Sequence, residues 1–178
     1  MQYTSETMLV KSKDQGGTGI FAEVSAQQAG WEYLNTRAVR LNRGEQHSGN
    51  TAGYEQVAVI LGGQCDIHTS EGNFLKVGRR PNVFSGMPYA LYLPPHTDYQ
   101  LTSLTDGFEV ALCWVPSDQR YPAKLVTPRD CKIELRGGAN VSRQINSILP
   151  PGFPCHRLVC VEVYTPSGNW SSYPPHKH

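Results

Sequence analysis

Two histidines, His176 and His178, stand one residue apart behind Pro174 and Pro175 in the stretch NWSSYPPHKH. Alternate side chains of a β-strand face the same side, so both imidazoles can point into one site. Proline lacks the backbone donor of a ladder and is typical of a strand start or an edge. Imidazole pairs suit divalent metals such as Zn, Mn, Fe or Ni. The pattern indicates half of a metal site, with a solvated tail or the remnant of a purification tag as the alternatives.

A second stretch, RGEQHSGNTAGYEQVAVILGG (residues 43–63), is similar to the first sequence motif of cupin barrels. That motif has a glycine, an H-x-H pair, a glutamate three or four residues later and a further glycine. Glu55 and Gly62 fit the spacing, but Gly49 and Thr51 stand where the histidines belong. A longer variant of the motif would place Ser48 and Asn50 there. None of these residues is a strong metal ligand.

The second cupin motif, a proline followed by a histidine, falls near LPPHTDY. Tyr99 holds the expected ligand position, and His96 lies before it. A metal site needs three or four converging groups. We therefore expect the first barrel to hold no metal, and we interpret His47, His68 and His96 as surface or hydrogen-bonded histidines.

Short runs of β-branched and aromatic residues, separated by turn residues, recur along the chain and predict an all-β fold. The runs are EQVAVILGGQCDIHT, YALYLPP, YQLTSLT, FEVALCWVP and HRLVCVEVYTP. We expect a cupin barrel, a double-stranded β-helix or jelly roll, with antiparallel strands and little helix before about Pro122. One helix is predicted, SRQINSIL (residues 142–149), with Ser142 as its N-cap and Pro150 ending it.

The stretch VPSDQRYPAKLVTPRDCK combines three prolines with several charges and indicates a domain boundary. We place the first barrel in residues 1–122, and the linker and the start of a second barrel in residues 123–178. The segment from Lys132 onward is too short to close a second barrel, so we expect the remainder of that barrel to follow in a longer protein.

Composition excludes several classes of protein. The chain of 178 residues has 16 Lys and Arg against 15 Asp and Glu, so no excess charge favours nucleic acid or an anionic membrane. No apolar run approaches the roughly 20 residues of a membrane helix. The start lacks the order of a signal peptide, so we expect a cytoplasmic protein. Five cysteines without a C-x-x-C indicate reduced, buried thiols, with a catalytic thiol as the alternative.

TPSGNWSSYPPHKH (residues 165–178) resembles the signature of the 5-deoxy-glucuronate isomerases of bacterial inositol catabolism, which belong to a bicupin family with the uronate isomerases of pectin breakdown. Other agreeing segments are GWEYL, VGRRPNVFSGMPYALYLPP and RGGANVSRQINSIL. The resemblance implies two barrels in one chain, with the metal in the C-terminal barrel and His176 and His178 as its first ligands. It places a further glutamate and histidine beyond His178, so we expect an N-terminal portion of a longer enzyme.

The implied reaction interconverts 5-deoxy-D-glucuronate and 5-dehydro-2-deoxy-D-gluconate, with a divalent metal as Lewis acid. The sequence assigns no catalytic base. The substrate carboxylate needs a cation, and four arginines could supply it by charge alone. They are Arg79, Arg80, Arg136 and Arg143. Solvated turn residues or inter-domain ion pairs are the alternatives for each of them.

Two other functions remain open at this point. A metal-free cupin could bind a sugar or a regulatory ligand, and the first barrel could be a scaffold for dimerisation or for docking of the second. For the isomerase, the expected partners are a small-molecule sugar acid and further copies of the chain in a homo-oligomer, without nucleic acid or membrane.

Overall fold

The computed structural model describes residues 4, 10–12 and 16–174. Strands dominate it, as the sequence predicts. The strands are β1 (Gly19–Val24), β2 (Asn35–Leu41), β3 (Gln46–Asn50), β4 (Tyr54–Gly62), β5 (Cys65–Thr69), β6 (Gly72–Val77), β7 (Tyr89–Leu93), β8 (Asp98–Ser103), β9 (Phe108–Pro116), β10 (Lys124–Val126), β11 (Lys132–Arg136), β12 (Arg143–Leu149) and β13 (Cys160–Tyr164). The helical elements are the short α2 (Ala26–Ala29) and a 3-10 turn, η1 (Ala139–Val141).

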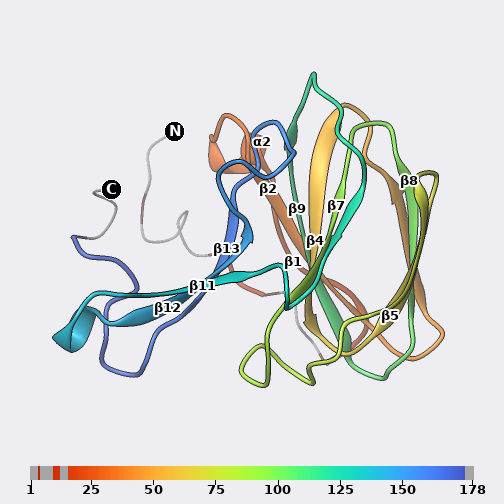
Figure 1. The fold of residues 1–178 in the computed structure, drawn as a ribbon. Coiled ribbons are helices and arrows are strands. Elements are labelled where there is room, and N and C mark those ends of the chain that lie inside the picture. The colour runs from red at the N-terminus through yellow and green to blue at the C-terminus, as the bar shows by residue number, and fades with distance from the viewer. Residues whose placement is uncertain (1–3, 5–9, 13–15, 175–178) are drawn as a thin grey trace.

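The strands form three antiparallel sheets (Figure 1). A six-stranded sheet has the order β1-β2-β9-β4-β7-β10, and a four-stranded sheet has the order β3-β8-β5-β6. These two sheets face each other and form the barrel. The third sheet, β11-β12-β13, extends away from the barrel on the side opposite β5 and β8 (Figure 1). The all-β cupin barrel predicted from the sequence is confirmed.

The first hydrophobic core fills the space between the two barrel sheets. Because strand side chains alternate between faces, Ala58 and Ile60 of β4 point into this core together with Val39 of β2. The facing sheet contributes Ile67 and Leu101, which are almost completely buried. Burying one such aliphatic side chain contributes roughly 1.5–3 kcal/mol, so this core is the main source of barrel stability.

A second core lies on the other face of the six-stranded sheet. Val57 and Val59 of β4 and Tyr92 of β7 belong to it. Ile148 and Leu158, from the region around the third sheet, pack against them. The central strands are therefore covered on both faces, which accounts for the nearly continuous apolar run of β4.

The helix predicted over residues 142–149 is wrong, because this segment forms strand β12. It pairs with β11 on one side and with β13 on the other. Asn146 and Ser147 are poor helix formers, and the two ladders satisfy the backbone that a short helix would otherwise satisfy. Pairing with distant segments has overridden the local signal of Ser142 and Pro150.

The other strand predictions are confirmed by β4, β5, β7, β8, β9 and β13. The strands on either side of the Gly62–Gly63 turn belong to different sheets rather than to one hairpin. The division of the chain at residue 122 stays a prediction, and β10, which follows it, pairs with β7 of the barrel. No helix within the described ranges is long and apolar enough to cross a membrane.

Candidate functional site

The cupin ligand positions of the first barrel lie at one end of its interior. Gly49 of β3 pairs with Tyr99 of β8, and a Cβ added at Gly49 would lie 2.6 Å from the Tyr99 hydroxyl oxygen. The tyrosine side chain thus occupies the space that a side chain at position 49 would need. Thr51 is buried, and its hydroxyl donates to the Pro94 carbonyl oxygen at 2.8 Å. These residues present one glycine and two hydroxyl groups where histidines would be required, which is a poor ligand set for a divalent metal.

Glu55 fits the spacing of the motif but lies on the wrong face of β4 for a barrel site. It shares its face with Val57 and Val59 of the second core, whereas Gln56 faces the barrel interior with Ala58. Counted from Thr51 at the second histidine position, the motif with four intervening residues therefore fits the structure. It places the Gln56 amide at the position of the glutamate. The match of Glu55 to this position is corrected accordingly.

The buried Glu55 carboxylate has a structural environment of its own. It accepts backbone N–H groups from His156, Arg157 and Leu158 at 2.8, 2.6 and 2.9 Å, and the Tyr92 hydroxyl at 3.0 Å. Three consecutive backbone donors on one carboxylate hold the segment before β13 against the barrel. Burial, with the Glu55 charge as a further cause, raises the pKa of Tyr92, so this phenol remains a donor.

The three histidines that the sequence singled out do not converge. His47 is half-buried on β3, and its Nε2 has no hydrogen-bond partner among the described residues. His68 is exposed and lies 2.9 Å from the Asn73 side-chain oxygen. His96 is exposed in the loop before β8 and donates its backbone N–H to Ala52.

Arg80 connects the barrel with the third sheet. Its guanidinium binds both Glu162 carboxylate oxygens, at 2.7 and 2.9 Å, and donates twice to the Ile60 carbonyl oxygen. The Arg80 side chain is only 2% exposed. Arg80 thus forms an ion pair between the barrel and the third sheet, and it is not free to bind a substrate carboxylate.

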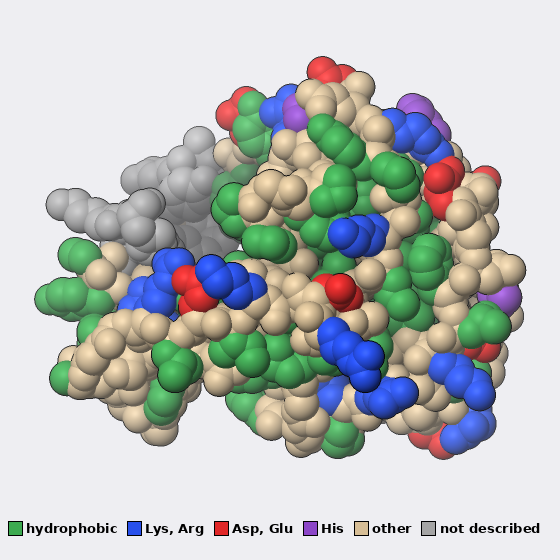
Figure 2. Space-filling view, viewed as in Figure 1, with side chains coloured by type: hydrophobic (Ala, Val, Ile, Leu, Met, Phe, Trp, Pro, Cys, Tyr) green, Lys and Arg blue, Asp and Glu red, His purple; other side chains and the backbone are tan. Residues whose placement is uncertain are grey.

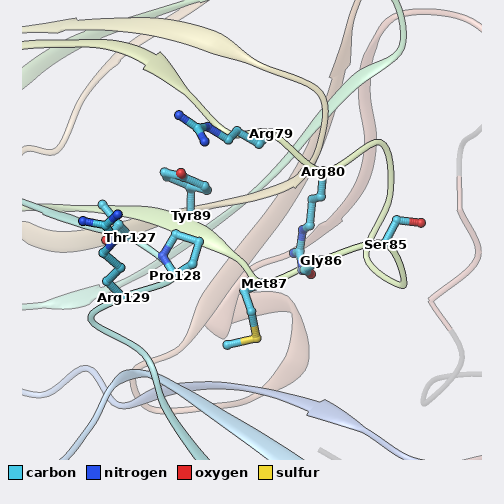
Figure 3. A pocket seen from close by; sticks show the side chains of 9 residues that line it. All are labelled: Arg79, Arg80, Ser85, Gly86, Met87, Tyr89, Thr127, Pro128 and Arg129. Atoms are coloured by element: carbon cyan, nitrogen blue, oxygen red, sulfur yellow. The ribbon is translucent and has the colours of Figure 1, made fainter.

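Arg79 lines a surface pocket of about 660 Å³ together with Arg129 and Tyr89. Figure 3 shows the Arg79 and Arg129 side chains on opposite sides of the Tyr89 ring, while Arg80 points away from them towards Gly86. Arg79 and Arg129 are exposed, so their guanidinium groups are accessible at this pocket.

The other two arginines lie on the third sheet. Arg136 forms an exposed ion pair with Glu134 at 2.7 Å. Arg143 donates to the Val141 carbonyl oxygen at 3.0 Å. Both line a pocket of about 700 Å³ with Leu135, which is 80% exposed. Figure 2 shows hydrophobic side chains at the surface along this sheet.

The predicted metal ligands His176 and His178 lie outside the described residues. Within residues 4, 10–12 and 16–174, no group of three or more His, Cys, Asp or Glu side chains could hold a metal ion. The described residues therefore do not provide a ligand set for a metal ion. The assignment of His176 and His178 as metal ligands stays a prediction.

Sequence reasoning missed Gln56 and Glu162. The motif allows either three or four residues between its second histidine and its glutamate. The alternation of inward- and outward-facing side chains along β4 was the signal that could have selected Gln56. Glu162 could have been recognised as an acidic residue inside an apolar strand, a position that normally requires a buried partner.

Comparison with known proteins agrees with this architecture. The family model described as KduI/IolB matches residues 8–178. A 5-deoxy-glucuronate isomerase of Geobacillus thermodenitrificans is 39% identical over 171 residues, which are 96% of this chain and 62% of the relative. The one of Bacillus subtilis strain 168 is 34% identical, over 91% of this chain and 60% of the relative.

A crystal structure of an IolB-like protein from Salmonella typhimurium LT2 is similar, with a TM-score of 0.87 and 31% identity over 92% of this chain and 62% of that one. The chain thus spans somewhat less than two thirds of the length of the relatives that it matches. The predicted resemblance to 5-deoxy-glucuronate isomerases is confirmed, and because the family model covers nearly the whole sequence, this chain belongs to the KduI/IolB family.

Proposed function

We propose that this chain is part of an aldose–ketose isomerase that interconverts 5-deoxy-D-glucuronate and 5-dehydro-2-deoxy-D-gluconate in myo-inositol catabolism. The observation that carries the proposal is the 39% identity, over 96% of the chain, to a relative of that name. The reaction moves hydrogen between adjacent carbons of the open-chain sugar. It needs a base within hydrogen-bond reach and stabilisation of the negative charge on the enediolate.

A divalent metal (Zn, Mn, Fe or Ni) held by His176 and His178 would supply that stabilisation as a Lewis acid. Both residues are imidazoles at strand spacing, which supports the proposal. The rest of the ligand set and the catalytic base are proposed to belong to the longer protein.

The described residues contribute the scaffold for this site. The Arg80–Glu162 ion pair and the Glu55 carboxylate both hold β13, or the segment leading into it, against the barrel. β13 ends at Tyr164, 12 positions before His176 in the sequence. We propose that the first barrel, up to about residue 122, positions the strands of a second barrel in residues 123–178 and beyond.

We further propose a sugar-acid substrate, a homo-oligomeric assembly and a cytoplasmic location. Light scattering coupled to size-exclusion chromatography would measure the oligomeric state of the purified protein. A strictly monomeric species would contradict that part of the proposal.

The decisive experiment uses the longer protein that contains this chain. His176→Ala and His178→Ala should each lower metal content and turnover together, by at least about 100-fold in turnover, since even partners outside the ligand shell contribute 10–100-fold. His68→Ala is the matched control, because His68 is exposed and bonds only a neighbouring side chain. Equal losses in all three variants would indicate general destabilisation and contradict the assignment.

A metal-free binding module is the second candidate, and the hydroxyl groups of Thr51 and Tyr99 at one end of the barrel interior favour it. Substrate binding without turnover, in protein loaded with each of the four metals, would support this alternative over the isomerase.

A further inference from the structure

The interior of the first barrel changes from aliphatic to polar and aromatic side chains towards one end, on four strands. On the inner face of β2, Leu41 and Val39 are followed by Arg37, and on β4, Ile60 and Ala58 are followed by Gln56. On β9, Val110 and Leu112 are followed by Trp114, and on β8, Leu101 is followed by Tyr99. Gln56 pairs with Trp114 in the strand register. Arg37 pairs with Leu112 and so lies one inward-facing position nearer the aliphatic core. The polar side chains therefore meet at one end of the barrel.

These side chains line a cavity of about 230 Å³. This volume is below the usual range of pockets for drug-sized molecules, so it suits a small ligand. The lining residues are Arg37, Ser48, Gly49, Asn50, Thr51, Ala52, Tyr54, Gln56, Tyr99, Leu112 and Trp114. No acidic side chain is among them. The Arg37 guanidinium is paired with Glu23, which is not part of the lining, and its remaining N–H groups can donate to the oxygen atoms of an anion.

Gln56 gives independent support for a ligand. Gln56 is 5% exposed, and its Nε2 makes no hydrogen bond of normal geometry to the described residues. Its amide nevertheless lies close enough to the Tyr99 hydroxyl to lower the pKa of that phenol, against the larger opposing effect of burial. An unpaired buried amide is costly, and such groups call for an explanation by a bound molecule or a function. Tyr99, with 8% exposure, brings its hydroxyl to the same cavity over Gly49.

Arg37 is held in position for binding. Its Nε and Nη2 donate to the Glu23 carboxylate at 2.9 and 2.5 Å, and its guanidinium carbon lies 5.4 Å from the Trp114 ring centre. Its Nη1 donates no hydrogen bond to described residues, and it is the group that can receive an anion. The Trp114 ring adds an apolar face of the kind that packs against the C–H groups of a polyol.

We propose that this cavity is a binding site for a small hydroxycarboxylate, whose carboxylate pairs with Arg37 and whose hydroxyl groups bond Gln56 and Tyr99. The residues that replaced the cupin metal ligands in the first barrel would thus form a ligand site of their own. The proposal does not depend on the isomerase activity, because none of these residues belongs to the predicted metal site.

The test uses the longer protein that contains this chain and isothermal titration with D-gluconate as the probe. D-Glucose, of similar size but uncharged, and inorganic phosphate, an anion without carbon hydroxyls, are the comparison ligands. We expect saturable binding of gluconate, at least tenfold tighter than either comparison ligand, and unchanged binding in the presence of a chelator. Phosphate binding as tightly as gluconate would overturn the hydroxycarboxylate assignment.

Two variants locate the site. Arg37→Ala and Gln56→Leu should each weaken gluconate binding about tenfold or more. Arg40→Ala is the matched control, since Arg40 lies on the same strand, points to the other face and has a comparable ion pair with Glu109. Circular dichroism would establish that each variant is folded.

A double variant, His176→Ala with His178→Ala, should bind gluconate normally. Absence of binding, loss in that double variant, or equal losses for Arg37→Ala and Arg40→Ala would overturn the proposal.

Discussion

Arg80 and Glu162, which lie 82 residues apart in the sequence, form a two-pronged ion pair between the edge of the barrel and the third sheet, with N–O distances of 2.7 and 2.9 Å. The Arg80 side chain is 2% exposed and that of Glu162 is 15% exposed. The remaining donors of Arg80 bond the carbonyl oxygens of Ile60 and Gly86. Both charges are thus paired and hydrogen-bonded, which is the condition under which burial of an ion pair is tolerated.

Arg80→Ala should lower the free energy of unfolding by about 3–5 kcal/mol, because it leaves the Glu162 carboxylate without its partner. Urea denaturation followed by circular dichroism would measure this loss. Arg136→Ala, which removes an exposed ion pair with Glu134, is the control and should change stability little. A double variant, Arg80→Met with Glu162→Leu, should recover much of the loss. Equal effects of Arg80→Ala and Arg136→Ala would contradict the role of the buried pair.

Glu55→Gln should lower the free energy of unfolding by about 1–3 kcal/mol. The amide would turn a donor towards the backbone N–H groups of Arg157 and Leu158, which now donate to the carboxylate. Chemical denaturation would measure the loss, and hydrogen exchange should show faster exchange at residues 156–158. Glu45→Gln is the control, because Glu45 is exposed and also accepts a backbone N–H, from Asn42 at 2.8 Å. Unchanged protection at residues 156–158 would contradict this prediction.

The sequence predicted those parts of the fold that depend on local pattern. The strand runs around Val57 and Leu91 carry both β-propensity and turn signals, and they formed strands. The helix predicted from Ser142 failed because its capping and stop signals are local, while the ladders to β11 and β13 are not.

In the candidate site, too, the sequence predicted what depends on local residue chemistry but not what depends on the arrangement of the strands. Gly49, Thr51 and Tyr99 could be recognised as poor metal ligands from their chemistry alone. The sequence could not show that Glu55 faces away from the barrel and that Gln56 faces into it, since a shift of one residue in a strand exchanges its faces. It also could not show that Arg80 is already paired with Glu162, because nothing in a linear pattern brings β13 to the edge of the barrel.

Native-state alkylation should leave Cys65 and Cys160 unmodified at pH 8. Burial raises the pKa of each thiol to about 12, so almost no thiolate is present. The pKa values of Cys113, Cys131 and Cys155 are also raised by burial, which speaks against the catalytic-thiol alternative. Iodoacetamide treatment with mass spectrometry would measure the modification, and all five cysteines should react in urea. Rapid modification of Cys65 in the folded protein would contradict this assignment of its environment.

His47 should make the barrel less stable as the pH falls below about 6.5. Burial, with the nearby Arg37 charge as a second cause, lowers the pKa of His47 from its ordinary value of 6.5. Between the folded and the unfolded pKa values the unfolded state binds more protons, so stability is fully present above about 6.5 and is lost as the pH falls towards the folded pKa. The neighbours of His47 provide no anion to compensate an imidazolium charge. The Tyr99 ring centre lies 6.3 Å from that of His47, and Leu101 is the residue paired with His47 on β8.

Urea denaturation at pH values from 5 to 7.5 should show a shallower decline in stability for His47→Gln than for the unmodified chain. His68→Gln, at an exposed position in the same sheet, should keep the original slope. Identical slopes for the His47→Gln variant and the unmodified protein would show that His47 does not carry this pH dependence.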